Sequence, residues 1–195
     1  MFQKILFGCT LLVTILLYLF LNGNLQLMQD PLPPLGKFLN PFRGAWTSDT
    51  NGEKNAILLD AKGLKDQVEI IYDERRVPHI FSQNMEDALF AQGYVEAQNR
   101  LFQMEFLSMA ASGELSSIIG NKTLEIDLEK RRRGMKYAAE NAVKGWDKTQ
   151  NYNTVNRYID GVNAYMSSLK KEDLPLEFKL FDFEPTTWTP LKSAL

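Results

Sequence analysis

The chain has 195 residues, a net charge of −2 at neutral pH, and 45% hydrophobic, 24% charged and 11% aromatic residues. This apolar content is enough for a packed core, which excludes a disordered chain, a collagen and a low-complexity tail. The slightly acidic balance argues against a nucleic-acid-binding domain, which is normally basic. One cysteine and one histidine exclude a disulfide framework, a cysteine-based zinc module and a histidine-rich metal site.

The first segment is strongly apolar. Residues 5–21 carry no charge, and Lys4 is the only charged residue before Asp30. In a helix these residues would measure about 25 Å, which approaches the thickness of the hydrocarbon core of a bilayer. The interpretations are an uncleaved membrane anchor, a cleaved signal peptide and a buried soluble helix. Residues 21–24, Leu-Asn-Gly-Asn, make a poor small-x-small cleavage site, so an anchor is favoured.

The chain divides into three parts: a signal-anchor or transmembrane segment at 1–24, a tether at 25–53 and a globular domain at 54–195. Four prolines and two glycines between residues 30 and 51 indicate the tether. With Lys4 inside and the remainder outside, the positive-inside rule places the domain outside the cytoplasm, in a bacterial periplasm. Apolar side chains in the tether indicate that part of it packs or lies at the bilayer surface: Leu35, Phe38, Leu39, Phe42 and Trp46.

The domain begins with strand-like segments. We expect a short strand at 56–59 and two further strands at 68–72 and 77–81, the last two joined by a charged hairpin loop at 73–76. Pro78 has no N–H to donate, so its strand should lie at an edge of the sheet or begin there.

Helices follow the strands. Asn84 is a good N-cap and Gly113 a good stop for one long helix, whose apolar residues form two neighbouring stripes and predict burial on more than one side. Buried polar groups need partners, so we expect Arg100 and Glu105 to share a structural network, with a substrate contact as the alternative. Further helices are expected at 129–144 and 149–169.

No motif by itself names a reaction. The sequence lacks a Gly-x-Ser-x-Gly elbow, a Walker loop, a His-Glu-x-x-His zinc site and a Gly-x-Gly-x-x-Gly fingerprint. His79 follows a proline in an apolar run, and a satisfied structural histidine is the favoured interpretation. The basic run at 130–133 follows Asp127 and Glu129, which favours a solvated or packed helix face. Composition and spacing alone indicate an exported, membrane-linked α+β fragment of unknown function.

A set of short motifs in a fixed order goes further. The set comprises Val77-Pro78-His79-Ile80, Asp87, Gly93-Tyr94-Val95, the run Ala-Gln-Asn-Arg-Leu-Phe-Gln-Met-Glu at 97–105, Gly113-Glu114-Leu115, Ile119-Gly120, Asp127, Arg132, the run 158–164 and Pro185-x-x-Trp188-Thr189-Pro190. From about Val68 to Pro190 the chain resembles the amino-terminal, α-chain part of the penicillin acylase family. Three positions depart from that family: Arg76 replaces a glycine, Asn99 an aspartate and Lys192 an aspartate.

The resemblance implies an α+β fold, the mainly helical α-chain portion of an αββα N-terminal-nucleophile hydrolase, preceded here by a transmembrane helix. It implies a zymogen that matures by autoproteolysis, releasing a serine or cysteine at the start of a β-chain. That hydroxyl or thiol would attack an amide with its own α-amino group as base, beside an oxyanion hole. It also implies a structural calcium in the full-length protein, with ligands mostly outside this chain.

The implied partners are the β-chain of the same precursor, the membrane and a small-molecule amide, with no nucleic acid. Acylated β-lactams, acyl-homoserine lactones and other N-acyl compounds are the candidate substrates. The nucleophile is expected outside the chain, because residues 1–195 contain no Gly-Ser, Gly-Thr or Ser-Asn, and the one Gly-Cys, Gly8-Cys9, lies in the apolar segment. We therefore assign no catalytic, cofactor-binding or metal-ligating residue within the chain.

The leading hypothesis is thus a fragment of an amidohydrolase precursor that is inactive alone. Its strand edges and apolar faces would need the β-chain for cover. Two alternatives stay open. One is a non-catalytic, membrane-anchored scaffold or binding module that retains the fold, which a stop codon directly after Leu195 in the gene would favour. The other is an independent enzyme that uses His79.

Overall fold

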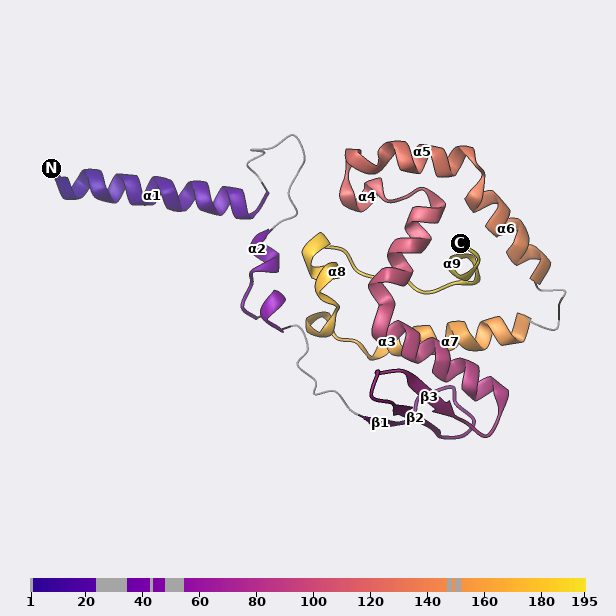
Figure 1. The fold of residues 1–195 in the computed structure, drawn as a ribbon. Coiled ribbons are helices and arrows are strands. Elements are labelled where there is room, and N and C mark those ends of the chain that lie inside the picture. The colour runs from indigo at the N-terminus through magenta and orange to yellow at the C-terminus, as the bar shows by residue number, and fades with distance from the viewer. Residues whose placement is uncertain (1, 24–34, 43, 48–54, 147–148, 150–151) are drawn as a thin grey trace.

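The computed structural model describes residues 2–23, 35–42, 44–47, 55–146, 149 and 152–195. A small sheet lies at one end of the domain, the long helix α3 runs from it through the centre, and α1 extends away from the remainder (Figure 1). The helices are α1 Phe2–Leu21, α2 Leu35–Phe38, α3 Met85–Ser112, α4 Ser116–Ile119, α5 Leu124–Arg132, α6 Met135–Trp146, α7 Tyr152–Ser168, α8 Leu176–Phe181 and α9 Pro190–Ala194, with 3₁₀ turns η1 Ala45–Thr47, η2 Asn121–Thr123 and η3 Lys171–Asp173. The strands are β1 Ala56–Leu59, β2 Val68–Tyr72 and β3 Pro78–Phe81.

The three strands form one antiparallel sheet in the order β1-β2-β3. Because side chains alternate along a strand, β2 buries Val68 and Ile70 while Glu69 is exposed. The buried side packs on α3 through Phe90 and Val95. The predicted strands and hairpin are confirmed, and the proline falls in β3, at an edge of the sheet.

Helix α3 has the predicted ends. The Asn84 side chain accepts a hydrogen bond from the backbone N–H of Asp87 at 2.9 Å, and Gly113 ends the helix with φ +73°. The sequence did not predict a kink at Arg100, where φ is −142° and ψ is 21°. The kink divides α3 into one half that packs on the sheet and one half that continues toward α4 and α5 (Figure 1).

Helices α3 and α7 cross in backbone-to-backbone contact. A Cβ atom added to Gly93 would lie 2.1 Å from the carbonyl oxygen of Tyr158, and one added to Gly161 would lie 1.9 Å from the carbonyl oxygen of Phe90. Only glycine allows this approach. It brings the α7 residue Val162 against Ala97 and Leu101 of α3 in a second apolar cluster, completed by Ile159, Phe178 and Trp188.

Two expectations need correction. The helix predicted at 129–144 is two helices, α5 and α6, because Gly134 between them adopts φ +71°. The segment predicted as a tether contains α2 and η1 at 35–42 and 44–47, and the rest of 25–53 lies outside the described residues. The predicted helix at 149–169 is α7, Tyr152–Ser168.

Substituting Gly161 by alanine should destabilise the protein by about 1–3 kcal/mol, because the new methyl group would overlap the α3 backbone. The matched control is Gly145→Ala in α6, where an added Cβ meets nothing within 4 Å. That change should stabilise by about 0.5–1 kcal/mol through helix propensity. Chemical denaturation of both variants measures the difference, and equal effects would contradict the close crossing.

Candidate functional site

An open groove of about 1110 Å³ follows α3 around its kink. Edge strand β3 forms one wall through Pro78 and Ile80, and Pro175 contributes to another part of the rim. The floor of the groove is formed by part of the run at 97–105, which is the most specific motif of the sequence. The lining residues from this part are Gln98, Asn99, Arg100, Leu101, Phe102 and Gln103.

The polar side chains at the kink, Asn99, Arg100 and Gln103, are exposed to solvent. The Arg100 guanidinium is exposed and donates to Oε1 of Gln103 at 3.1 Å. The Asn99 side-chain amide donates to the carbonyl oxygen of Val95 at 2.8 Å. The expected buried network between Arg100 and Glu105 is therefore wrong. Residues five positions apart lie about 140° apart around a helix, so the two side chains project from different sides of α3.

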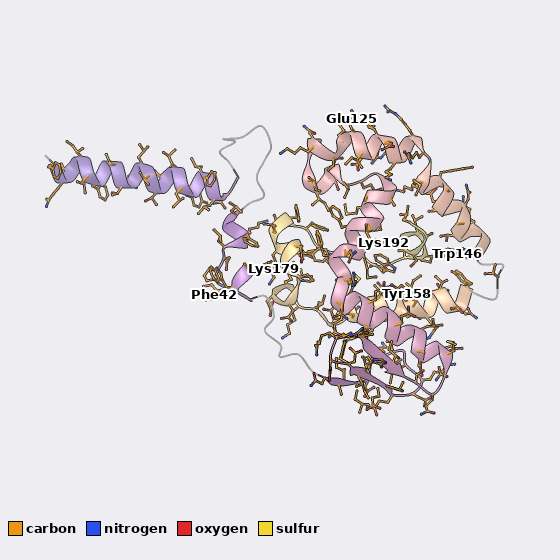
Figure 2. The ribbon with its side chains drawn as sticks, in the orientation of Figure 1. Phe42, Glu125, Trp146, Tyr158, Lys179 and Lys192 are labelled. Carbon is orange, nitrogen blue, oxygen red and sulfur yellow. The ribbon has the colours of Figure 1, made fainter. Side chains whose placement is uncertain are left out.

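Glu105 is 3% exposed and has another partner, Lys192. The Lys192 ammonium lies 2.8 Å from Oε1 and 2.7 Å from Oε2, and the Thr186 hydroxyl donates to Oε1 at 3.0 Å. The same ammonium lies 5.4 Å above the ring of Trp188. This pair ties α9 to the second half of α3, beside which Lys192 is labelled in Figure 2. The sequence signal for this pair is a carboxylate in an otherwise apolar helix, because a buried carboxylate requires a partner such as a cation.

Asp87 is fully buried and organises the start of α3. Its carboxylate accepts from the backbone N–H groups of Lys65 and Asp66 at 3.0 and 2.9 Å, and from Arg157 at 3.2 Å. Burial raises the pKa of Asp87, but these bonds and the one from Asn84 outweigh it and leave the pKa below its ordinary value. Arg157 also lies over the Phe90 ring, so this carboxylate joins the sheet loop, α3 and α7.

Asp127 organises the turn after α3. It is 2% exposed and accepts from the backbone N–H groups of Leu115 at 2.9 Å and Ser116 at 2.7 Å. Burial raises the pKa of Asp127, but the hydrogen bonds from Ser116 and Leu115 hold it below its ordinary value. Asp87, Glu105 and Asp127 are thus buried structural carboxylates whose oxygens are already occupied.

His79 does not face the groove. Because Pro78 and Ile80 line it, the alternation of a strand turns His79 to the opposite face of the sheet. The imidazole is about half exposed, and its Nε2 lies 3.4 Å from Oδ2 of Asp73. This arrangement is a surface contact of the hairpin and gives no support to an enzyme that uses His79.

A second cavity of about 550 Å³ lies beside α3 near α7 and α9. Tyr158, Trp146, Trp188 and Leu195 contribute to its lining. The Tyr158 hydroxyl donates to Oε2 of Glu96 at 2.9 Å, and burial together with this carboxylate raises the pKa of Tyr158. Tyr158 therefore stays protonated and acts as a hydrogen-bond donor.

The family model for penicillin amidase matches residues 67–195. The chain belongs to the penicillin amidase family. It is 36% identical over 135 residues to the acyl-homoserine lactone acylase QuiP of Pseudomonas aeruginosa, covering 69% of this chain and 16% of that protein. It is 33% identical over 135 residues to the penicillin acylase 2 proenzyme of a Pseudomonas species, covering 69% and 17%. The chain thus spans about a sixth of the length of these curated relatives.

A solved structure shows the same relationship. The thermostable penicillin G acylase from Alcaligenes faecalis matches with a TM-score of 0.56 and 26% sequence identity, covering 65% of this chain and 67% of that chain. The shared fold is that of a penicillin amidase, here mostly helical with a small sheet.

The structure shows what each residue does at the three positions where the sequence is expected to depart from the family pattern. Arg76 adopts φ +62°, a left-handed conformation that favours glycine, and its guanidinium lies 5.0 Å from the centre of the Tyr72 ring. Asn99 donates to a backbone carbonyl, which an ionised aspartate could not do. Lys192 neutralises Glu105. None of the three departures introduces a reacting group.

The described residues offer no place for the calcium that the family resemblance implies. They contain no cluster of three or more His, Cys, Asp or Glu side chains that could hold a metal ion. Asp87, Glu105 and Asp127 already receive N–H groups or cations, so their oxygens do not fit a calcium ligand set.

Replacing Lys192 by methionine should destabilise the protein by about 3–5 kcal/mol, because it leaves the Glu105 charge buried and unpaired. Adding Glu105→Leu should recover most of the loss. The matched control is Lys171→Met, which breaks an exposed pair with Glu184 and should cost at most about 1 kcal/mol. Denaturant titration measures all three, and similar costs for the two lysines would show that the pair with Glu105 is weak.

Asp127 should make stability depend on pH in acid. Its folded pKa lies below the ordinary value of 3.8, so its contribution is complete above about pH 4 and is lost as the pH falls through the folded pKa. Asp127→Asn should be less stable at neutral pH by about 1–3 kcal/mol, since an amide nitrogen cannot accept from Ser116. The difference in the free energy of unfolding between wild type and variant should become smaller below pH 4 in acid-unfolding curves. A constant difference would contradict the role of the charge.

Proposed function

We propose that this chain is the amino-terminal, α-chain part of a penicillin acylase-type amidohydrolase precursor. The full-length protein would hydrolyse the linear amide of an N-acyl compound, such as an acylated β-lactam or an acyl-homoserine lactone, to a carboxylate and an amine. The match over residues 67–195 carries the proposal. The solved acylase chain supports it, with 26% sequence identity and a TM-score of 0.56 over 65% of this chain. A curated relative whose name includes the word proenzyme supports a precursor.

The open surfaces of the domain support a missing partner. The face of the sheet opposite α3 carries Leu58, Ile71 and Phe81, which are 61%, 38% and 55% exposed. Both β1 and β3 are edge strands within the described sheet, with backbone groups free for further pairing. A half-covered sheet with exposed large apolar side chains is typical of one layer of a larger structure. We propose that the β-chain of the same precursor covers it.

The division of labour in the proposed enzyme follows from what this chain contains. The β-chain would supply an amino-terminal serine, whose hydroxyl attacks the amide carbonyl while its own α-amino group takes the proton. An oxyanion hole would stabilise the tetrahedral intermediate. This chain would supply the frame, with its groove at the α3 kink and its three buried structural carboxylates. A calcium of the full-length protein would have its ligands mostly outside this chain.

We further propose that α1 anchors the enzyme in the membrane and that its globular part is extracytoplasmic. Helix α1 has 20 residues, high mean hydropathy and no buried residue. Its length of about 30 Å equals the thickness of the hydrocarbon core. The charged residue within it, Lys4, lies near the end where the positive-inside rule would place it.

The proposed activity can be tested with the full-length gene product. We expect it to split into two chains and to release amine from penicillin G or from an N-acyl-homoserine lactone, measured with an amine-reactive dye. Sequencing of the new amino terminus should show serine, and replacing that serine by alanine should leave an intact, inactive precursor. Residues 1–195 alone should release no amine. An uncleaved full-length protein without turnover would favour a membrane-anchored scaffold instead.

A further inference from the structure

We propose that the juxtamembrane segment, defined as residues 35–42 and 44–47, is a bilayer-surface contact that holds the domain against the lipid headgroups through Phe42 and Trp46. The inference rests on the proposed membrane anchoring by α1. In this proposal the juxtamembrane segment is held against the membrane surface and is not a free tether. The occupant of this apolar surface is the bilayer itself.

The first step is the position of the segment. Helix α2 abuts the carboxyl end of α1, since a Cβ atom added to Gly36 would lie 3.1 Å from the carbonyl oxygen of Leu21. A helix of 20 residues has the length of the hydrocarbon core, so its last residue lies at the boundary with the headgroups. The residues that touch this end therefore lie at headgroup depth.

The second step is that the globular domain holds the segment from the other side. Lys37 forms an ion pair with Asp182 at the end of α8, with Nζ 2.6 Å from Oδ2. Lys179 of α8 donates to the carbonyl oxygen of Gly44 at 3.3 Å and to that of Glu172 at 2.6 Å. Burial lowers the pKa of Lys179. The segment is thus packed between α1 and α8 (Figure 1).

The third step is the internal order of the segment. Gly44 is buried, and its backbone N–H donates to the carbonyl oxygen of Asn40 at 2.8 Å. The side chain of Asn40 accepts from the backbone N–H of Phe42 at 2.9 Å. A Cβ atom on Gly44 would lie 2.1 Å from the carbonyl oxygen of Phe38. These contacts fold the chain into a compact turn.

The fourth step is what this turn displays. Phe42 is 82% exposed and Trp46 is 74% exposed, whereas the core aromatic residues Phe178 and Trp188 are 1% and 6% exposed. Phe42 lies on the side of the domain from which α1 extends (Figure 2). Tryptophan is favoured at the membrane–water interface, where its ring meets lipid and its N–H meets water, and Phe42 adds an apolar ring beside it. An exposed pair of them beside the end of an apolar helix fits that environment.

The choice of lipid over a protein partner follows from continuity. Helix α1 and the juxtamembrane segment belong to one chain and touch each other, so insertion of the first brings the second to the bilayer without any separate binding partner. Burying two aromatic rings would add the hydrophobic effect to the anchoring by α1. The domain would then have a fixed height and orientation above the membrane.

The test uses the full-length protein in phosphatidylcholine vesicles with brominated acyl chains, which quench nearby tryptophan fluorescence. The difference spectrum between wild type and Trp46→Phe isolates Trp46, and Trp146→Phe isolates a control tryptophan at the far end of α6. We expect the bromolipid to quench the Trp46 signal at least twofold more than the Trp146 signal. Equal quenching of the two signals would overturn the proposal. Both substitutions are conservative, and circular dichroism confirms that each variant folds.

A second readout separates this inference from the anchoring on which it rests. After an alkaline carbonate wash, a protein anchored by α1 stays with the vesicles. If it stays and Trp46 is unquenched, the surface contact is wrong while the anchor stands. If the protein is washed off, the anchor is wrong and the contact falls with it. Enzymatic activity can be present in either case, so the proposed hydrolysis is judged independently.

Discussion

The contact between α3 and α7 is the constraint on which the rest of the domain depends. Gly93 and Gly161 let two backbones meet, and that approach sets the distance from the sheet to the helices beyond it. It places Arg157 over the Phe90 ring and within reach of Asp87. It also brings Asn163 to the backbone of Trp188, which fixes the segment leading into α9. Burial of apolar surface supplies the energy, and the glycine pair decides the geometry.

Local signals made much of this fold predictable from the sequence. The three strands, the cap at Asn84 and the stop at Gly113 follow from alternation, a capping side chain and a left-handed glycine, each readable within a few residues. The kink at Arg100 could not be read in this way, because no proline or glycine stands at or beside it. The break at Gly134 was readable in principle, yet the basic run beside it resembled an uninterrupted helix.

The candidate site likewise depends on contacts between residues far apart in the sequence, which local patterns do not reveal. The groove could not be anticipated, since its walls come from β3, α3 and the start of α8. Glu105 needed a cation that no helical spacing could identify, as Lys192 lies 87 residues later. The ordered motifs correctly indicated the family. Most of the motif residues proved to be structural: buried carboxylates, close-packed glycines and the Asn163–Trp188 pair. A family pattern can thus record how a frame is built more strongly than what the frame catalyses.

The ion pair between Glu105 and Lys192 also has a bearing on synthesis. A chain is made from its amino terminus, so α3 emerges from the ribosome well before the lysine that neutralises its buried charge. Until that lysine appears, the carboxylate is stabilised by water, and the middle of α3 cannot settle permanently into an apolar environment. Packing of the second half of α3 is therefore coupled to the arrival of α9, because the buried carboxylate has no cation until Lys192 is present.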